Sequence, residues 1–91
     1  MDVLEVVANH CDIRRLDKQC NFRSCSKKPG KEVLIYELDR ITLKTRDLIY
    51  LYLCSNHFDH AMRTFMVDLD RMKNHSKILR ARVRNIGFVT Y

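Results

Sequence analysis

Two pairs of residues in this 91-residue chain have the spacing of metal ligands. Cys20 and Cys25 form a C-x4-C pair, and Cys54 and His57 form a C-x2-H pair farther along the chain. Thiolates and imidazoles are donors that Zn²⁺ prefers, and structural zinc sites take four of them in a tetrahedron. Because each pair closes only a short loop, folding has to close a single long loop to complete the set. The sequence therefore predicts a structural zinc site at these four residues.

Buried free thiols and disulfides are the alternatives to a zinc site. Cysteine is among the residue types most often buried, and Cys54 ends an apolar run that could belong to the core. Four cysteines also permit three disulfide pairings. Since the N-terminus has no basic leader, we expect reduced thiols in an intracellular protein of the cytoplasm or nucleus. Cys11, His10 and His60 could each replace one of the four predicted ligands.

The net charge of +6 is concentrated at the C-terminal end. Residues 1–70 carry equal numbers of acidic and basic side chains, whereas residues 71–91 carry basic side chains and no acid. Such an asymmetry predicts an anionic partner, DNA or RNA, while the simpler alternative is a solvated basic face. The candidate nucleic-acid-binding residues are Lys73, Lys77, Arg80, Arg82 and Arg84.

The segments that precede Cys54 have distinct secondary-structure patterns. Residues 2–17 fit either an amphipathic helix or a strand, and the turn-forming residues of 18–31 predict a knuckle loop. Glu32–Leu38 and Leu48–Leu53 are rich in β-branched and aromatic residues. This composition predicts a β-hairpin that brings Cys54 back toward the knuckle.

A helix is expected from about Ser55, as its N-cap, to about residue 73. Its apolar side chains recur at helical spacing, at Phe58, Met62, Phe65, Leu69 and Met72. This helix could continue to about residue 86, which would place four of the basic residues in one stripe. Alternatively, the alternation over Arg80–Arg84 predicts a strand, followed by a final strand at Phe88–Tyr91.

These elements predict one α+β domain, with a zinc-stapled β-hairpin packed on a long C-terminal helix. Its parts would be an N-terminal segment (1–17), a zinc-binding core (18–73) and a basic C-terminal segment (74–91). The order of knuckle, hairpin and ligand-bearing helix resembles the treble-clef class of zinc fingers, over about Cys20 to Met72. That resemblance implies structural roles for all four ligands. Treble clefs serve nucleic-acid binding, protein docking, ubiquitin chemistry and endonuclease catalysis, so the fold does not fix the function.

We predict a zinc-binding module that binds nucleic acid through its basic C-terminal segment, as a small transcriptional regulator could. The alternative is a protein-interaction or homodimeric assembly module with structural zinc, because both predicted strands are apolar on both faces. No enzyme is predicted, and a nuclease on a treble-clef scaffold, using Asp59 and His60, is the minor alternative. No membrane span is expected, since the longest apolar run, Leu48–Cys54, is far shorter than the roughly 20 residues required.

Overall fold

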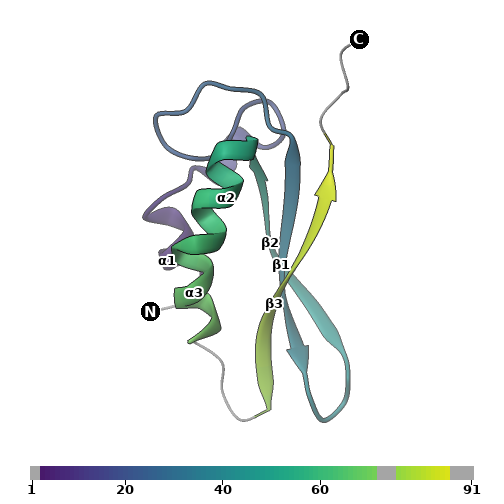
Figure 1. Ribbon diagram of the computed structural model, residues 1–91. Coiled ribbons are helices and arrows are strands. Elements are labelled where there is room, and N and C mark those ends of the chain that lie inside the picture. The colour runs from purple at the N-terminus through teal and green to yellow at the C-terminus, as the bar shows by residue number, and fades with distance from the viewer. Residues whose placement is uncertain (1–2, 72–75, 87–91) are drawn as a thin grey trace.

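A three-stranded antiparallel sheet with the strand order β2-β1-β3 forms the centre of the fold. The computed structural model describes residues 3–71 and 76–86. The strands are β1 (Lys31–Asp39), β2 (Thr45–Leu53) and β3 (Lys77–Asn85). The helices lie on one side of the sheet, and no described helix covers the other side (Figure 1).

The predicted hairpin is confirmed as β1 and β2. The two strands pair from Lys31 opposite Leu53 to Ile35 opposite Ile49, and an irregularity follows before Tyr36. At the turn, the Asp39 carboxylate accepts hydrogen bonds from backbone N–H groups two and three residues later, a local bond typical of turns. The hairpin therefore returns the chain to the knuckle directly before Cys54.

Among the described residues, three short helical segments and a 3₁₀ turn accompany the sheet. Helix α1 (Val3–Ala8) answers the ambiguity of the N-terminal segment in favour of a helix, and η1 (Ile13–Arg15) is the 3₁₀ turn. Helix α2 (Ser55–Arg63) begins close to the predicted start and is followed by α3 (Phe65–Asp70). All of these segments are too short to be stable alone, so packing on the sheet and on one another must hold them.

The prediction of a long C-terminal helix is wrong. Thr64 leaves helical geometry, with φ −111° and ψ −90°, and α3 ends at Asp70. The Thr64 hydroxyl donates to the His60 carbonyl at 2.8 Å, a local bond that competes with the helical ladder. The predicted helical position Met72 lies outside the described residues.

The strand alternative for the basic segment is confirmed by β3. Its residues pair with β1 from Lys31 opposite Asn85 to Asp39 opposite Lys77. This segment fits both a helix pattern and a strand pattern, and hydrogen bonding to the second edge of β1 selects the strand. The third strand also stabilises the hairpin, because an isolated two-stranded ribbon is only marginally stable in water. The predicted helical stripe of basic residues therefore does not form, and the predicted strand Phe88–Tyr91 lies outside the described residues.

The hydrophobic core lies between the helices and one face of the sheet. Phe65 and Leu69 of the predicted apolar stripe are fully buried, and Phe58 and Met62 pack partly against the same core. The sheet and α1 supply most of the other fully buried apolar side chains, namely Val6, Val7, Val33, Ile35, Leu51 and Leu53. This core fixes the sheet against α2 and so positions the two predicted ligand pairs.

Candidate metal centre

The four predicted ligands come together at one end of the sheet. The donor atoms of Cys20, Cys25, Cys54 and His57, which we call the Cys3His cluster, all lie within 4.8 Å of one another. The three cysteines are buried, His57 is half-buried, and none of the chain's cysteines forms a disulfide. The cluster can therefore hold a metal ion.

Three donor–donor distances within the Cys3His cluster are close to those of tetrahedral coordination. His57 Nδ1 lies 3.6 Å from Cys20 Sγ and 3.3 Å from Cys54 Sγ, and the Sγ atoms of Cys25 and Cys54 are 3.9 Å apart. Metal–donor bonds of about 2.3 Å to sulfur and 2.1 Å to nitrogen imply S···S and S···N separations of about 3.8 and 3.6 Å in a tetrahedron. These three separations are close to the tetrahedral values, and the remaining donor pairs lie within 4.8 Å of one another.

The start of α2 positions the second ligand pair. Cys54, rather than the predicted Ser55, occupies the N-cap position, and its carbonyl accepts the Phe58 N–H at 2.8 Å. No side-chain hydrogen bond caps the helix, which leaves the Cys54 thiol for the cluster. His57 lies three residues later, so both donors point to the same side of the helix.

Arg15 holds the knuckle that carries the first ligand pair. One nitrogen of its guanidinium, Nη1, donates to the backbone carbonyls of Cys20 (3.0 Å), Phe22 (2.9 Å) and Cys25 (2.6 Å). The side chain therefore binds the main chain of both knuckle cysteines and brings a positive charge to thiols that ionise on metal binding. Arg15 was missed by the sequence analysis, because nothing in its local pattern marks it.

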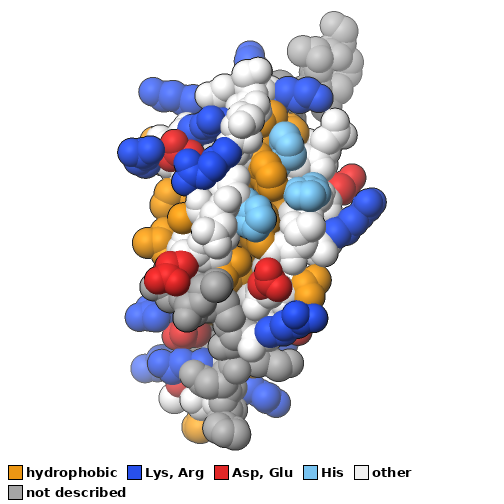
Figure 2. Space-filling view, turned by 90° about the vertical axis from the view of Figure 1, so that its left-hand side faces the viewer, with side chains coloured by type: hydrophobic (Ala, Val, Ile, Leu, Met, Phe, Trp, Pro, Cys, Tyr) orange, Lys and Arg blue, Asp and Glu red, His pale blue; other side chains and the backbone are white. Residues whose placement is uncertain are grey.

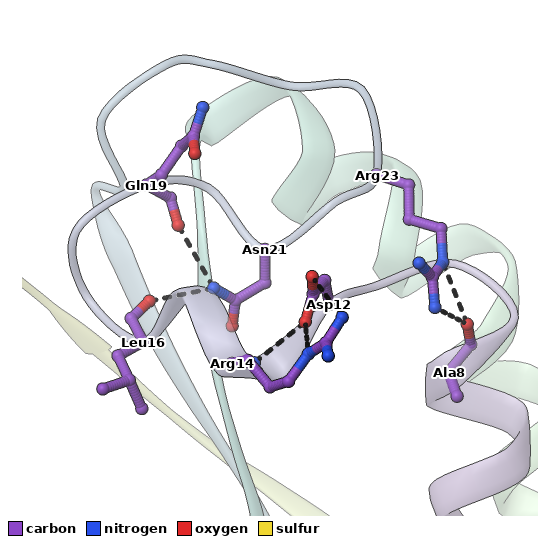
Figure 3. A network of polar contacts seen from close by, with 7 residues as sticks. All are labelled: Ala8, Asp12, Arg14, Leu16, Gln19, Asn21 and Arg23. Carbon is purple, nitrogen blue, oxygen red and sulfur yellow. Dashed lines mark hydrogen bonds and ion pairs between the residues drawn. The ribbon is translucent and has the colours of Figure 1, made fainter.

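Asn21 joins the knuckle to β2. Its side chain is fully buried and donates to the carbonyls of Leu16 (2.8 Å) and Gln19 (3.1 Å), as Figure 3 shows. Its carboxamide oxygen accepts the Tyr52 N–H at 2.9 Å, and its own N–H donates to the Tyr52 carbonyl at 2.7 Å. These bonds fix Cys20 beside the end of the strand that leads into Cys54.

The N-terminal segment supports the knuckle from a second direction. The Arg23 guanidinium donates to the Ala8 carbonyl at the end of α1, at 2.8 and 3.1 Å (Figure 3). An isolated β-bridge joins Cys11 to Phe22. The helix α1 and the ligand loop are thus packed as one unit.

The thiols differ in how readily they lose a proton. Burial raises the pKa of Cys11 to about 12, with help from Cys20, and burial likewise raises the pKa of Cys20 to about 11. Burial also opposes ionisation of Cys25, but the Lys27 N–H and the neighbouring thiols outweigh it and bring the pKa of Cys25 below its usual range. A metal ion bound here would displace thiol protons, so its affinity must fall in acid.

The three alternative ligands are near the Cys3His cluster but are not members of it. Cys11 is buried, and His10 and His60 are in contact with the Phe22 ring, at centroid distances of 6.0 and 5.3 Å. The same ring stacks on His57 at 4.4 Å, with 2° between the planes. Histidine and hydrophobic side chains accordingly lie together on the helical side of the molecule (Figure 2). Phe22 therefore covers the half-buried ligand His57.

The predicted nucleic-acid-binding residues are spread along β3. Leu79 and Ala81 pack toward the core, so Arg80, Arg82 and Arg84, which alternate with them, lie on the opposite face of the sheet. All three arginines are exposed. Lys77 is half-buried and forms an ion pair with Glu37 at 3.7 Å, and Lys73 lies outside the described residues.

Comparison of the chain with protein-family models, curated proteins and solved structures finds no match. Within the described residues, no helix has the length and apolarity needed to cross a membrane. The metal-ligand geometry and the surface of the sheet are therefore the observations on which a function can rest.

Proposed function

We propose that this protein is a zinc-stapled module that binds nucleic acid through the face of its sheet that no described helix covers. The observation that carries the proposal is the register of β3. Arg82 is opposite Leu34 and Arg84 is opposite Glu32, so successive arginines extend along one exposed face. An array of arginines on one surface fits a chain of phosphates, each of which binds a guanidinium by charge-assisted hydrogen bonds.

Zinc is the proposed metal because of the donor set. Three thiolates and one imidazole in a tetrahedron are typical of structural zinc sites, in which every coordination position belongs to the protein. Three thiolates and a neutral imidazole around Zn²⁺ leave one net negative charge, which the Arg15 guanidinium behind the knuckle partly offsets. The proposed role is structural, with no catalytic step.

The treble-clef class is the proposed architecture for the metal-binding part of the chain. The order of knuckle, β1–β2 hairpin and α2 supports it, since the first ligand pair lies in the knuckle and the second at the helix start. The strand β3 would then be an addition that completes the sheet and carries the arginines.

A salt series on two charge-matched variants tests nucleic-acid binding. The first combines Arg80→Gln, Arg82→Gln and Arg84→Gln, and the control removes the same charge elsewhere with Arg40→Gln, Arg63→Gln and Arg71→Gln. All six arginines are exposed. Each phosphate contact contributes about 0.9 to the slope of log affinity against log salt on duplex DNA, and about 0.7 on single strands.

The β3 variant should lose a slope of about 2 to 3 and most of its affinity, whereas the control should bind like the parent chain. Fluorescence anisotropy with labelled DNA and RNA measures both quantities. Equal affinities for the two variants would overturn the proposal. So would a parent chain that binds neither DNA nor RNA at low salt.

A further inference from the structure

We infer that the uncovered face of the sheet selects unpaired bases, so that the ligand is single-stranded nucleic acid. This inference rests on the proposed function and adds the class of nucleic acid. The surface concerned, which we call the Tyr–Arg face, combines three tyrosines from β1 and β2 with three arginines from β3, namely Tyr36, Tyr50, Tyr52, Arg80, Arg82 and Arg84.

The strand register places tyrosines and arginines in the same rows across the sheet, on either side of β1. Tyr50, Leu34 and Arg82 form one row across the sheet, and Tyr52, Glu32 and Arg84 form the next row. The Arg82 guanidinium lies 5.3 Å from the centre of the Tyr36 ring. Aromatic rings on which bases stack, with cations beside them for phosphates, are the combination that single-strand-binding surfaces use.

Leu34 gives the Tyr–Arg face an apolar floor of its own. Its side chain is only 6% exposed, yet it points away from the helices and is not part of the main core cluster. Tyr50 beside it remains 45% exposed. Because no described helix lies on this side of the sheet, a flat ring can stack above Leu34 and its neighbours (Figure 1).

The acids on this face do not cancel its charge. Glu32 is paired with Arg84 at 2.9 Å, and Asp47 accepts a hydrogen bond from the Tyr50 hydroxyl at 3.4 Å. Arg80 and Arg82 have no ion-pair partner among the described residues. Charge complementarity therefore favours an anionic ligand over a second copy of the chain, whose arginines would meet these arginines across a shared interface.

The shape of the face favours single strands over duplexes. The major groove of B-DNA, about 12 Å wide, admits one helix or a two-stranded ribbon. The Tyr–Arg face is three strands wide, with neighbouring strands about 4.8 Å apart and side chains extending beyond them. A duplex would meet this face only through its phosphates, whereas unpaired bases can also reach the rings.

Anisotropy titrations of the full chain with zinc test this inference. The probes are labelled oligo-dT and oligo-U and a hairpin duplex of equal charge, at one salt concentration. Tyr50→Leu removes the exposed ring, and Tyr50→Phe retains it and is the matched control. Circular dichroism and zinc content verify that both variants are folded.

We expect the chain to bind the single strands at least tenfold more tightly than the duplex. Tyr50→Leu should weaken single-strand binding about tenfold, which is the usual cost of one lost stacking contact. It should leave duplex binding and the salt slope unchanged, since no phosphate contact is removed. Tyr50→Phe should bind single strands like the parent chain.

The outcomes separate this inference from the proposed function. The inference would be overturned, and the proposed function kept, by three results together. The chain would bind duplex and single strands equally, Tyr50→Leu would have no effect, and the β3 arginine variant would still lose affinity. A failure to bind any nucleic acid overturns both. Self-association in sedimentation that Tyr50→Leu abolishes, without nucleic-acid binding, would reassign the face to a second copy of the chain.

Discussion

The Cys3His cluster and the Tyr–Arg face differ in how their side chains are buried and held in place. The cluster draws its donors from the knuckle and α2, buries most of them, and holds their backbone with Arg15 and Asn21. The Tyr–Arg face takes its side chains from regular alternation along three strands and leaves its arginines exposed. Changes at the cluster should therefore cost stability, and changes at the face should cost binding.

Removing one metal ligand should have the largest effect. A structural zinc site contributes an apparent stabilisation of about 10–16 kcal/mol, which is as large as the whole stability of a typical domain. Cys54→Ser, or chelation of the metal, should therefore unfold the chain, as measured by circular dichroism and thermal melting.

Cys11→Ser is the matched control for that experiment. Cys11 is as buried as Cys54, but it lies outside the Cys3His cluster. The variant should stay folded and keep its metal. If Cys11→Ser unfolded and Cys54→Ser stayed folded, Cys11 would be the metal ligand and Cys54 the core cysteine.

Truncating Asn21 should have the next largest effect. Asn21→Ala leaves the Tyr52 N–H and the carbonyls of Leu16 and Gln19 without their buried partner, which should lower the free energy of unfolding by about 3 kcal/mol. Urea denaturation measures the change. Asn9→Ala, at an exposed position, should stay within about 0.5 kcal/mol of the parent chain.

Two neighbouring arginines should differ in their effect on metal affinity. Arg15→Gln removes the donor to three knuckle carbonyls and should weaken zinc binding about 10- to 100-fold, as loss of a supporting partner does at metal sites. Arg14→Gln changes an exposed side chain whose one ion-pair partner among the described residues is Asp12, and this variant should bind zinc normally. Competition with a chromophoric chelator measures both affinities, and equal values would remove the role assigned to Arg15.

A single change on the Tyr–Arg face should have the smallest effect on stability. Arg82→Gln loses an exposed cation–π contact with Tyr36, worth about 0.5–1 kcal/mol. The same change should weaken nucleic-acid binding measurably at low salt. A destabilisation of several kcal/mol without any change in binding would show that Arg82 stabilises the fold. The expected contrast, in which the Cys3His cluster provides stability and the Tyr–Arg face provides binding, would then be wrong.

The candidate ligand cluster and the hairpin could be predicted from the sequence because their signals are local. The spacing of Cys20 and Cys25, and of Cys54 and His57, carries the chemistry of the metal site within a few residues. The β-branched and aromatic residues of β1 and β2 suit the pleated, half-buried surface of a sheet, so local composition also predicts the hairpin.

The remaining features depend on contacts that no local pattern specifies. Arg15 binds backbone carbonyls five to ten residues along the chain, and Asn21 binds Tyr52, 31 residues away. The residues after Asp70 carry both a helical and a strand pattern, and pairing with β1 selects the strand. The Tyr–Arg face can be recognised only from the register, which places Arg82 in the row of Tyr50 and next to Tyr36.

Native mass spectrometry of the intact chain, purified without added metal, tests the central claim most directly. We predict one bound zinc per chain in the parent protein, in Cys11→Ser and in His60→Ala, and none in Cys54→Ser or His57→Ala. The bound metal should replace thiol protons, which the measured mass resolves. A folded parent chain without metal, or zinc retained after loss of both Cys54 and His57, would contradict the account.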